Sequence, residues 1–217
     1  MSFYAVAKGR TNGIFLSWKD CSQSVKGYKN AKYKKFSTKE EAEEFISQTC
    51  ITQNLDNHHY VEHQLTCRPN YFVYTDGSCI HNGKSNARAG IGIFFDMDDP
   101  RNISKKIEGK QTNNVAELMA LIDAYSIVKH DVVNGKNIAI VSDSEYAIKC
   151  ATHYGAKCSK QDWMVDIPNK ELVKKAYETY KNVKNIQLIH IRAHTNNTDI
   201  HSRGNDFADK LANQALG

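Results

Sequence analysis

The sequence lacks any apolar run that approaches the roughly 20 residues of a membrane-spanning helix. Its beginning, MSFYAVAKGR, contains neither the apolar core nor the small-residue cleavage site of a secretory signal. None of the six cysteines lies in a CxxC pair, and no Cys/His spacing resembles a zinc site. We therefore expect an intracellular protein of the nucleus or cytoplasm, with reduced thiols and no membrane partner.

Basic residues are concentrated at one end of the chain. The 217 residues carry a formal net charge of +5. Residues 1–36 contain eight Lys or Arg against one acid, a net charge of +7, which leaves −2 for the remainder. This concentration predicts a polyanion-binding module attached to a nearly neutral body.

The first 47 residues have the pattern of a small α+β unit. Short strands are predicted over residues 3–7, 13–18 and 32–36, with a short helix over 19–25. Thr38 and Glu41 have the spacing of a capping box, so we expect a helix that starts there and ends near Ser47.

Residues 48–70 are rich in Gln, Asn, His and Thr and show no sustained period, which indicates a tether between domains. Two interpretations of its histidines His58, His59 and His63 are open, a metal site or a polar linker tract. We favour the linker, because no carboxylate or cysteine frame surrounds them.

Residues 71–217 have a mixed α/β pattern. Strands are predicted over 71–76, 89–95, 103–109, 137–142 and 186–191, and helices over 113–129, 144–152, 170–181 and 204–215. The order βββαβααβα predicts an α/β fold, one mixed five-stranded sheet flanked by helices. The chain thus divides into domains 1–47 and 71–217, joined by a polar linker, 48–70.

Four acidic positions stand out in this second part. Asp76 in YTDGSC and Asp143 in IVSDSEY each end a strand-like apolar run, and Glu117 in TNNVAEL lies on a helix-like segment. GNDFADKLA offers Asp206 or Asp209, both in the predicted first turn of the closing helix. A carboxylate ending a buried strand is costly without a cation, and hard divalent cations prefer oxygen ligands. The acids therefore predict metal-dependent chemistry on phosphates.

Six segments, in this order and spacing, resemble the type 1 ribonuclease H family: YTDGSC, ARAGIGIFF, QTNNVAEL, IVSDSEYAIKC, IRAH and GNDFADKLA. Each alone is a weak signal, but together they are specific. FYAVAKGRTNGIFLSW and AKYKKF resemble the hybrid-binding domain that precedes the catalytic domain in the eukaryotic-like members. The resemblance implies a ribonuclease H-like sheet preceded by this small α+β domain.

The resemblance implies an endonuclease that hydrolyses the RNA strand of RNA–DNA hybrids, leaving 3′-hydroxyl and 5′-phosphate ends. It implies two Mg²⁺ ions, with Mn²⁺ as a substitute, and a monomer. The implied metal ligands and catalytic residues are Asp76, Glu117, Asp143 and Asp209, with His194 assisting proton transfer or product departure. Asp206 is then a helix-start charge. A non-catalytic hybrid-binding protein is the alternative, and the complete set of four acids argues against it.

The resemblance also implies residues that contact the hybrid. In the catalytic domain these are Asn82, Lys110, Thr112, Asn113, Asn114 and Asn169. In the first domain they are Tyr4, Trp18, Tyr33, Lys34 and Lys35, although a place for Tyr4 in the core of that domain is also open. The segment 152–168 is shorter than the basic protrusion of many relatives. Its Trp163 is either part of a reduced substrate handle or a packing residue.

Overall fold

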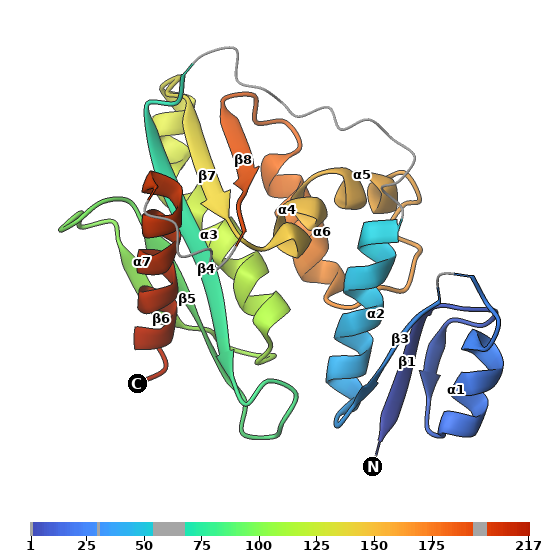
Figure 1. Ribbon diagram of the computed structural model, residues 1–217. Helices are drawn as coiled ribbons and strands as arrows, with labels where there is room; N and C mark the ends of the chain where they lie inside the picture. The colour runs from blue at the N-terminus through green and yellow to red at the C-terminus, as the bar shows by residue number, and fades with distance from the viewer. Residues whose placement is uncertain (1, 30, 54–67, 193–198) are drawn as a thin grey trace. The chain divides into compact units, whose positions relative to one another are not determined.

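The computed structural model describes residues 2–29, 31–53, 68–192 and 199–217, which form two compact units (Figure 1). Each unit is built around its own sheet. The first unit comprises β1 (Phe3–Lys8), β2 (Gly13–Phe15), α1 (Trp18–Val25), β3 (Lys32–Phe36) and α2 (Lys39–Gln53). Its sheet is antiparallel in the order β2-β1-β3.

Two boundaries of the first unit differ from the prediction. Trp18, which we placed at the end of a strand, begins α1 instead, because Ser17 caps that helix by accepting a hydrogen bond from the Asp20 N–H at 3.2 Å. The helix expected to end near Ser47 continues to Gln53. The predicted capping box is confirmed, since Thr38 and Glu41 exchange side-chain to backbone hydrogen bonds of 3.3 Å. His58, His59 and His63 lie outside the described residues.

The second unit is the predicted mixed five-stranded sheet. It comprises β4 (Tyr71–Ile80), β5 (Arg88–Phe94), β6 (Ile103–Lys106), α3 (Asn113–Val133), β7 (Ile138–Ser142), α4 (Glu145–Ala151), α5 (His153–Ser159), α6 (Lys170–Tyr180), β8 (Ile186–His190) and α7 (Ile200–Gln214). The strand order is β6-β5-β4-β7-β8. The pairs β4–β5 and β5–β6 are antiparallel, whereas β7 lies parallel to both β4 and β8.

Helices cover both faces of this sheet, with α7 against β4 and β5 on one face and α3 against the other (Figure 1). Fully buried aliphatic side chains fill the space between the layers, among them Val73, Ile91, Leu118, Leu121 and Ile140. Burial of such apolar area supplies most of the stability of this unit. None of the helices in the described part of the chain is both long and apolar enough for a membrane span.

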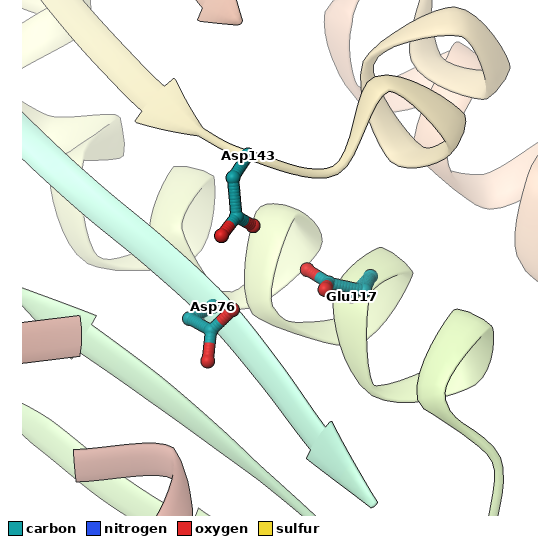
Figure 2. A group of neighbouring side chains, drawn as sticks. All are labelled: Asp76, Glu117 and Asp143. Carbon is teal, nitrogen blue, oxygen red and sulfur yellow. The ribbon is translucent and has the colours of Figure 1, made fainter. Parts of the chain in front are cut away.

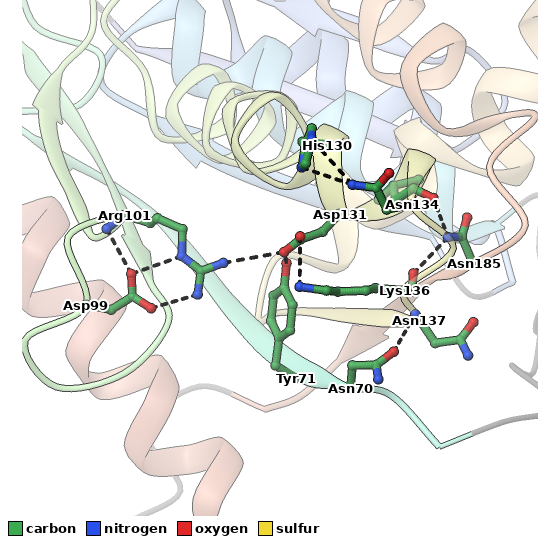
Figure 3. Close-up of polar contacts among 11 residues, drawn as sticks. Asn70, Tyr71, Asp99, Arg101, His130, Asp131, Asn134, Lys136, Asn137 and Asn185 are labelled. Atoms are coloured by element: carbon green, nitrogen blue, oxygen red, sulfur yellow. Dashed lines mark hydrogen bonds and ion pairs between the residues drawn. The ribbon is translucent and has the colours of Figure 1, made fainter.

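A polar network fixes the start of β4 against the end of α3 (Figure 3). The Tyr71 hydroxyl donates to Asp131 Oδ2 at 2.6 Å, and Lys136 forms an ion pair of 2.9 Å with the same carboxylate. Arg101 lies over the rings of Tyr71 and Phe95 and pairs with Asp131 at 3.7 Å. Because these contacts hold β4 and α3 together at one end, the two elements that carry Asp76 and Glu117 have a fixed relative position.

The closing helix begins earlier than predicted. Asp199 caps α7 by accepting from the backbone N–H groups of His201 and Ser202 at 2.9 and 3.1 Å. Asp206 and Asp209 therefore lie inside the helix, and the interpretation of Asp206 as a helix-start charge is wrong.

The segment 152–168 contains a helix, α5, that the sequence pattern did not predict. Trp163 follows it and is 8% exposed, with its ring 6.2 Å from that of Tyr177. Of the two interpretations of Trp163, this burial favours packing.

Candidate active site

Three of the predicted carboxylates meet at the centre of the second unit (Figure 2). In the parallel pair β4–β7, Thr75 lies opposite Ser142, so the residues that follow, Asp76 and Asp143, stand at the same level of the sheet. Glu117 joins them from the first turns of α3. One oxygen from each of the three carboxylates lies within 4.8 Å of the others.

Gly77 allows α3 to approach the strand this closely. A Cβ atom at Gly77 would lie 2.3 Å from the backbone nitrogen of Glu117 and 2.6 Å from the carbonyl carbon of Ala116. Any side chain there would push the helix away from β4. The glycine after Asp76 therefore sets the distance between Asp76 and Glu117.

A second close approach places the fourth acid. Gly92 on β5 lies directly opposite Asp76, and a Cβ there would stand 1.9 Å from the carbonyl oxygen of Ala208. The backbone of α7 thus rests on β5 next to Asp76 and carries Asp209 toward it. Asp209 lies outside the group of three, yet its charge is among the causes that raise the pKa of Asp76.

The carboxylates oppose one another's ionisation. Burial raises the pKa of Asp76 from 3.8 to about 7, together with the charges of Asp143 and Asp209, while a hydrogen bond from the Gly77 backbone lowers it. Burial, followed by the charges of Asp76 and Asp143, raises the pKa of Glu117 well above its ordinary range. Glu117 is 6% exposed, and its Oε2 has no hydrogen-bond partner. A bound cation would offset the repulsion between the carboxylates and would coordinate the unpaired oxygen of Glu117.

Comparison with known proteins agrees with this geometry. A family model described as RNase H matches residues 68–217, and one described as the Ribonuclease H1 N-terminal domain matches residues 2–46. The chain belongs to the ribonuclease H family. As predicted, it is a ribonuclease that hydrolyses RNA in RNA–DNA hybrids, with an N-terminal hybrid-binding domain and a dependence on divalent metal.

Relatives of this ribonuclease H match nearly the whole chain. Ribonuclease H of Schizosaccharomyces pombe is 33% identical, with 97% of this chain and 96% of the relative covered. Ribonuclease H1 of Homo sapiens is 27% identical, with coverages of 98% and 88%. Among solved structures, the PFV RNase H domain has a TM-score of 0.52 at 24% identity, over 69% of this chain and 95% of the other. That likeness supports the predicted fold.

Sequence reasoning missed Asn205. Its Nδ2 donates to Asp143 Oδ2 at 2.9 Å, and the residue is buried, with Oδ1 unpaired. The only signal in the sequence is its place four residues before Asp209, which puts both on one side of a helix. The prediction considered only the acids of GNDFADKLA and did not use this spacing.

Four of the six predicted substrate residues of the catalytic domain lie in two hydrogen-bonded pairs. Lys110 Nζ donates to Asn169 Oδ1 at 3.2 Å, and Asn82 Oδ1 accepts from the backbone N–H of Asn113 at 3.3 Å. Thr112 caps α3 and Asn114 is buried in its first turn. His194 lies outside the described residues.

In the first unit, the three predicted aromatic residues form one cluster. The ring of Trp18 lies 5.8 Å from that of Tyr4 and 5.7 Å from that of Tyr33. Trp18 and Tyr33 are 49% and 46% exposed, whereas Tyr4 is half-buried and also packs on the small core. The Lys35 ammonium stands 5.8 Å from the centre of the Tyr4 ring, and Lys34 is exposed on the same strand.

We predict that the metal-free protein loses stability as pH rises from about 4 to about 7. The unfolded chain releases the Asp76 proton near pH 3.8, whereas the folded protein holds it until the raised pKa of about 7. Over this range the folded state binds more protons than the unfolded state, so the free energy of unfolding falls. Chemical denaturation in EDTA across this range measures the slope.

Saturating Mg²⁺ is the control for this pH series. A cation that occupies the carboxylates replaces the proton, so the fall between about pH 4 and about pH 7 should largely disappear. Equal slopes in EDTA and in Mg²⁺ would show that these carboxylates are not the source.

Proposed function

We propose that this ribonuclease H cleaves RNA with two divalent ions, Mg²⁺ or in its place Mn²⁺, held by Asp76, Glu117, Asp143 and Asp209. The observation that carries the proposal is the group of three carboxylates within 4.8 Å, two of them buried. Within the described residues, no ion pair with Lys, Arg or His reaches any of the three. An all-oxygen set that lacks a basic partner suits hard cations.

Two bound cations supply an activated water and support for the leaving oxygen in an in-line displacement at phosphorus. The residues of the chain fix where that chemistry occurs. Asp76 shares its surroundings with the other acids and holds its proton up to about pH 7, so metal binding near neutral pH would release a proton. His194 would assist proton transfer or product departure, for which the usual histidine pKa near 6.5 is suited.

The amide side chains beside the carboxylates would distinguish the hybrid from other nucleic acids. Asn82, Asn113 and Asn114 lie at the end of β4 and the start of α3, and amides both donate and accept, as a 2′-hydroxyl does. Lys110 and Asn169, joined at 3.2 Å, would bind a phosphate of the DNA strand with Thr112. Lysine gives this pocket a charge without the bidentate fork of arginine.

The first domain would increase the affinity for the hybrid. Exposed Trp18 and Tyr33 offer ring faces, and Lys34 and Lys35 on β3 supply charge for phosphates. Such a combination binds nucleic acid without reading its sequence. We assign residues 1–47 to this domain, 48–70 to the linker and 71–217 to catalysis in a monomer. The first residues of the linker then continue α2, which ends at Gln53.

The decisive experiment offers the purified protein an RNA–DNA hybrid, double-stranded DNA and double-stranded RNA, each with Mg²⁺, Mn²⁺ or EDTA. We expect cleavage of the RNA strand of the hybrid alone, only with metal, and products that carry 5′-phosphate and 3′-hydroxyl ends. Tight hybrid binding without cleavage would favour the non-catalytic alternative. Cleavage of double-stranded DNA, or full activity in EDTA, would contradict the proposal.

We predict that Trp18→Ala weakens hybrid binding about tenfold, since one stacking aromatic contributes about 1–3 kcal/mol. Cleavage in a single encounter should survive, because Trp18 lies in the first unit and the carboxylates in the second. Binding is measured in EDTA, and processivity in Mg²⁺. Tyr28→Ala is the matched control, since Tyr28 is an exposed aromatic of the same unit outside the cluster. Equal affinities for the two variants would exclude the role of Trp18.

A further inference from the structure

Asp209 is held by a chain of two hydrogen bonds that reaches β4. The side chain of Asn213, four residues later on α7, donates from Nδ2 to Asp209 Oδ1 at 2.8 Å. The Oδ1 of the same amide accepts from the Ser78 hydroxyl at 2.6 Å. Ser78 lies two residues after Asp76 on β4. The chain thus joins Asp209 to the strand that carries the most central carboxylate.

Asp209 needs such support more than the other acids do. It is half-exposed and lies outside the group of three, so packing alone does not fix its side chain. A donor on Oδ1 restricts the rotation of the carboxylate and leaves Oδ2 free for a cation. The spacing of four residues on a helix makes Asn213 a direct neighbour of Asp209.

Ser78 holds the other end of the Asn213 amide. The Asp209 carboxylate only accepts hydrogen bonds, so it selects the amide orientation in which Nδ2 faces it. The amide oxygen then points away from Asp209, and the Ser78 hydroxyl donates to it. With both ends bonded, the amide is fixed as a donor to Asp209.

The same device occurs one turn earlier on α7. Asn205, Asp209 and Asn213 are spaced four apart and share one side of the helix. Asn205 donates to Asp143 Oδ2 at 2.9 Å, as Asn213 donates to Asp209. The two acids that are only half-buried each have an amide donor from α7.

We propose that Asn213 is a positioning residue that aims Asp209 at a divalent cation, and that Ser78 anchors its amide by bonding the amide oxygen. This inference rests on the proposed metal-binding role of Asp209. Groups that orient metal ligands typically change metal affinity by 10- to 100-fold when removed. Because Asn213 is exposed, we expect the lower end of that range.

The test is Asn213→Ala, followed by calorimetric titration of the substrate-free protein with Mg²⁺ and by the Mg²⁺ dependence of hybrid cleavage. Both midpoints should rise about tenfold. The melting temperature in EDTA should change little, since Asn213 is exposed and alanine favours helix. Gln214→Ala is the matched control, because an exposed residue five positions after Asp209 does not face it. Unchanged midpoints in Asn213→Ala overturn the inference.

Further variants test the route through Asp209. Ser78→Ala should raise the calorimetric midpoint by a smaller factor, and the double variant should match Asn213→Ala alone. In an Asp209→Asn background, Asn213→Ala should have no further effect on metal affinity; an effect of the same size there would refute the positioning role. If the wild type binds Mg²⁺ and cleaves hybrid but Asn213→Ala behaves identically, only this inference fails. If the wild type does neither, the proposed function fails and this inference with it.

Discussion

Asp76→Asn is expected to reduce hybrid cleavage by at least about a thousandfold. The position lies at the centre of the site, since its pKa responds to the charges of Asp143 and Asp209 and its oxygen belongs to the group of three. Metal ions contribute several kcal/mol to a phosphoryl transition state, and each 1.36 kcal/mol is tenfold in rate. An amide at this place keeps the shape of the side chain and removes the charge that attracts the cation.

The same substitution should have the opposite effect on stability without metal. At neutral pH in EDTA, Asp76→Asn removes a buried carboxylate that is repelled by its neighbours, so the free energy of unfolding should rise by a few kcal/mol, each unit of pKa being about 1.4 kcal/mol. Mg²⁺ should raise the melting temperature of the wild type and raise that of the variant much less. Equal shifts in both proteins would contradict the assignment of Asp76 as a metal ligand.

Asp206→Asn is the matched control for these measurements. It is the same chemical change in an exposed acid of α7, three residues before Asp209. We expect its cleavage rate and its Mg²⁺-dependent stabilisation to stay close to those of the wild type. A loss comparable with that of Asp76→Asn would mean that general charge near the site, rather than ligation, governs activity.

The site was predictable from the sequence to the extent that its residues sit in local motifs. Asp76 lies within β4, which continues past the predicted end to Ile80, and Asp143 directly follows β7. Since these are neighbouring parallel strands, the sheet itself brings the two acids level. Glu117 was predictable from its place on a helix that starts at a capping residue, Thr112. Contacts that depend on how α7 lies on the sheet were not predictable, and the amides of Asn205 and Asn213 belong to that class.

Gly204 shows why the start of α7 was misplaced. A glycine after a polar stretch indicates a break, and we began the helix there. In the structure Gly204 is inside α7, and a Cβ at this position would lie 2.3 to 2.5 Å from the ring atoms of Tyr74. The glycine is present because the helix passes directly over an aromatic ring, which no local pattern reveals. Trp163 is a similar case, because the sequence does not distinguish a buried tryptophan from an exposed one.

The tight packing of α3 on β4 leads to the second large expected effect, that of Gly77→Ala. The added methyl group would stand 2.3 Å from a backbone nitrogen and 2.6 Å from a backbone carbon, so no side-chain rotation can relieve it. Overpacking against movable side chains costs about 1–3 kcal/mol, and we expect at least about 3 kcal/mol here because a helix must shift. For a chain of this size that lowers the melting temperature by roughly 10 °C.

The cleavage rate of Gly77→Ala should also fall. The displaced backbone belongs to Glu117, so the displacement separates this carboxylate from Asp76. Gly109→Ala is the control, because it strains the backbone without displacing α3. Gly109 has a φ of +79° and nothing within 4 Å of its added Cβ, so it should lose only about 1–2 kcal/mol and keep full activity. Cleavage is compared at a temperature where both variants are folded. Similar losses of stability, with activity intact in both, would show that the spacing of strand and helix at Gly77 does not control the metal site.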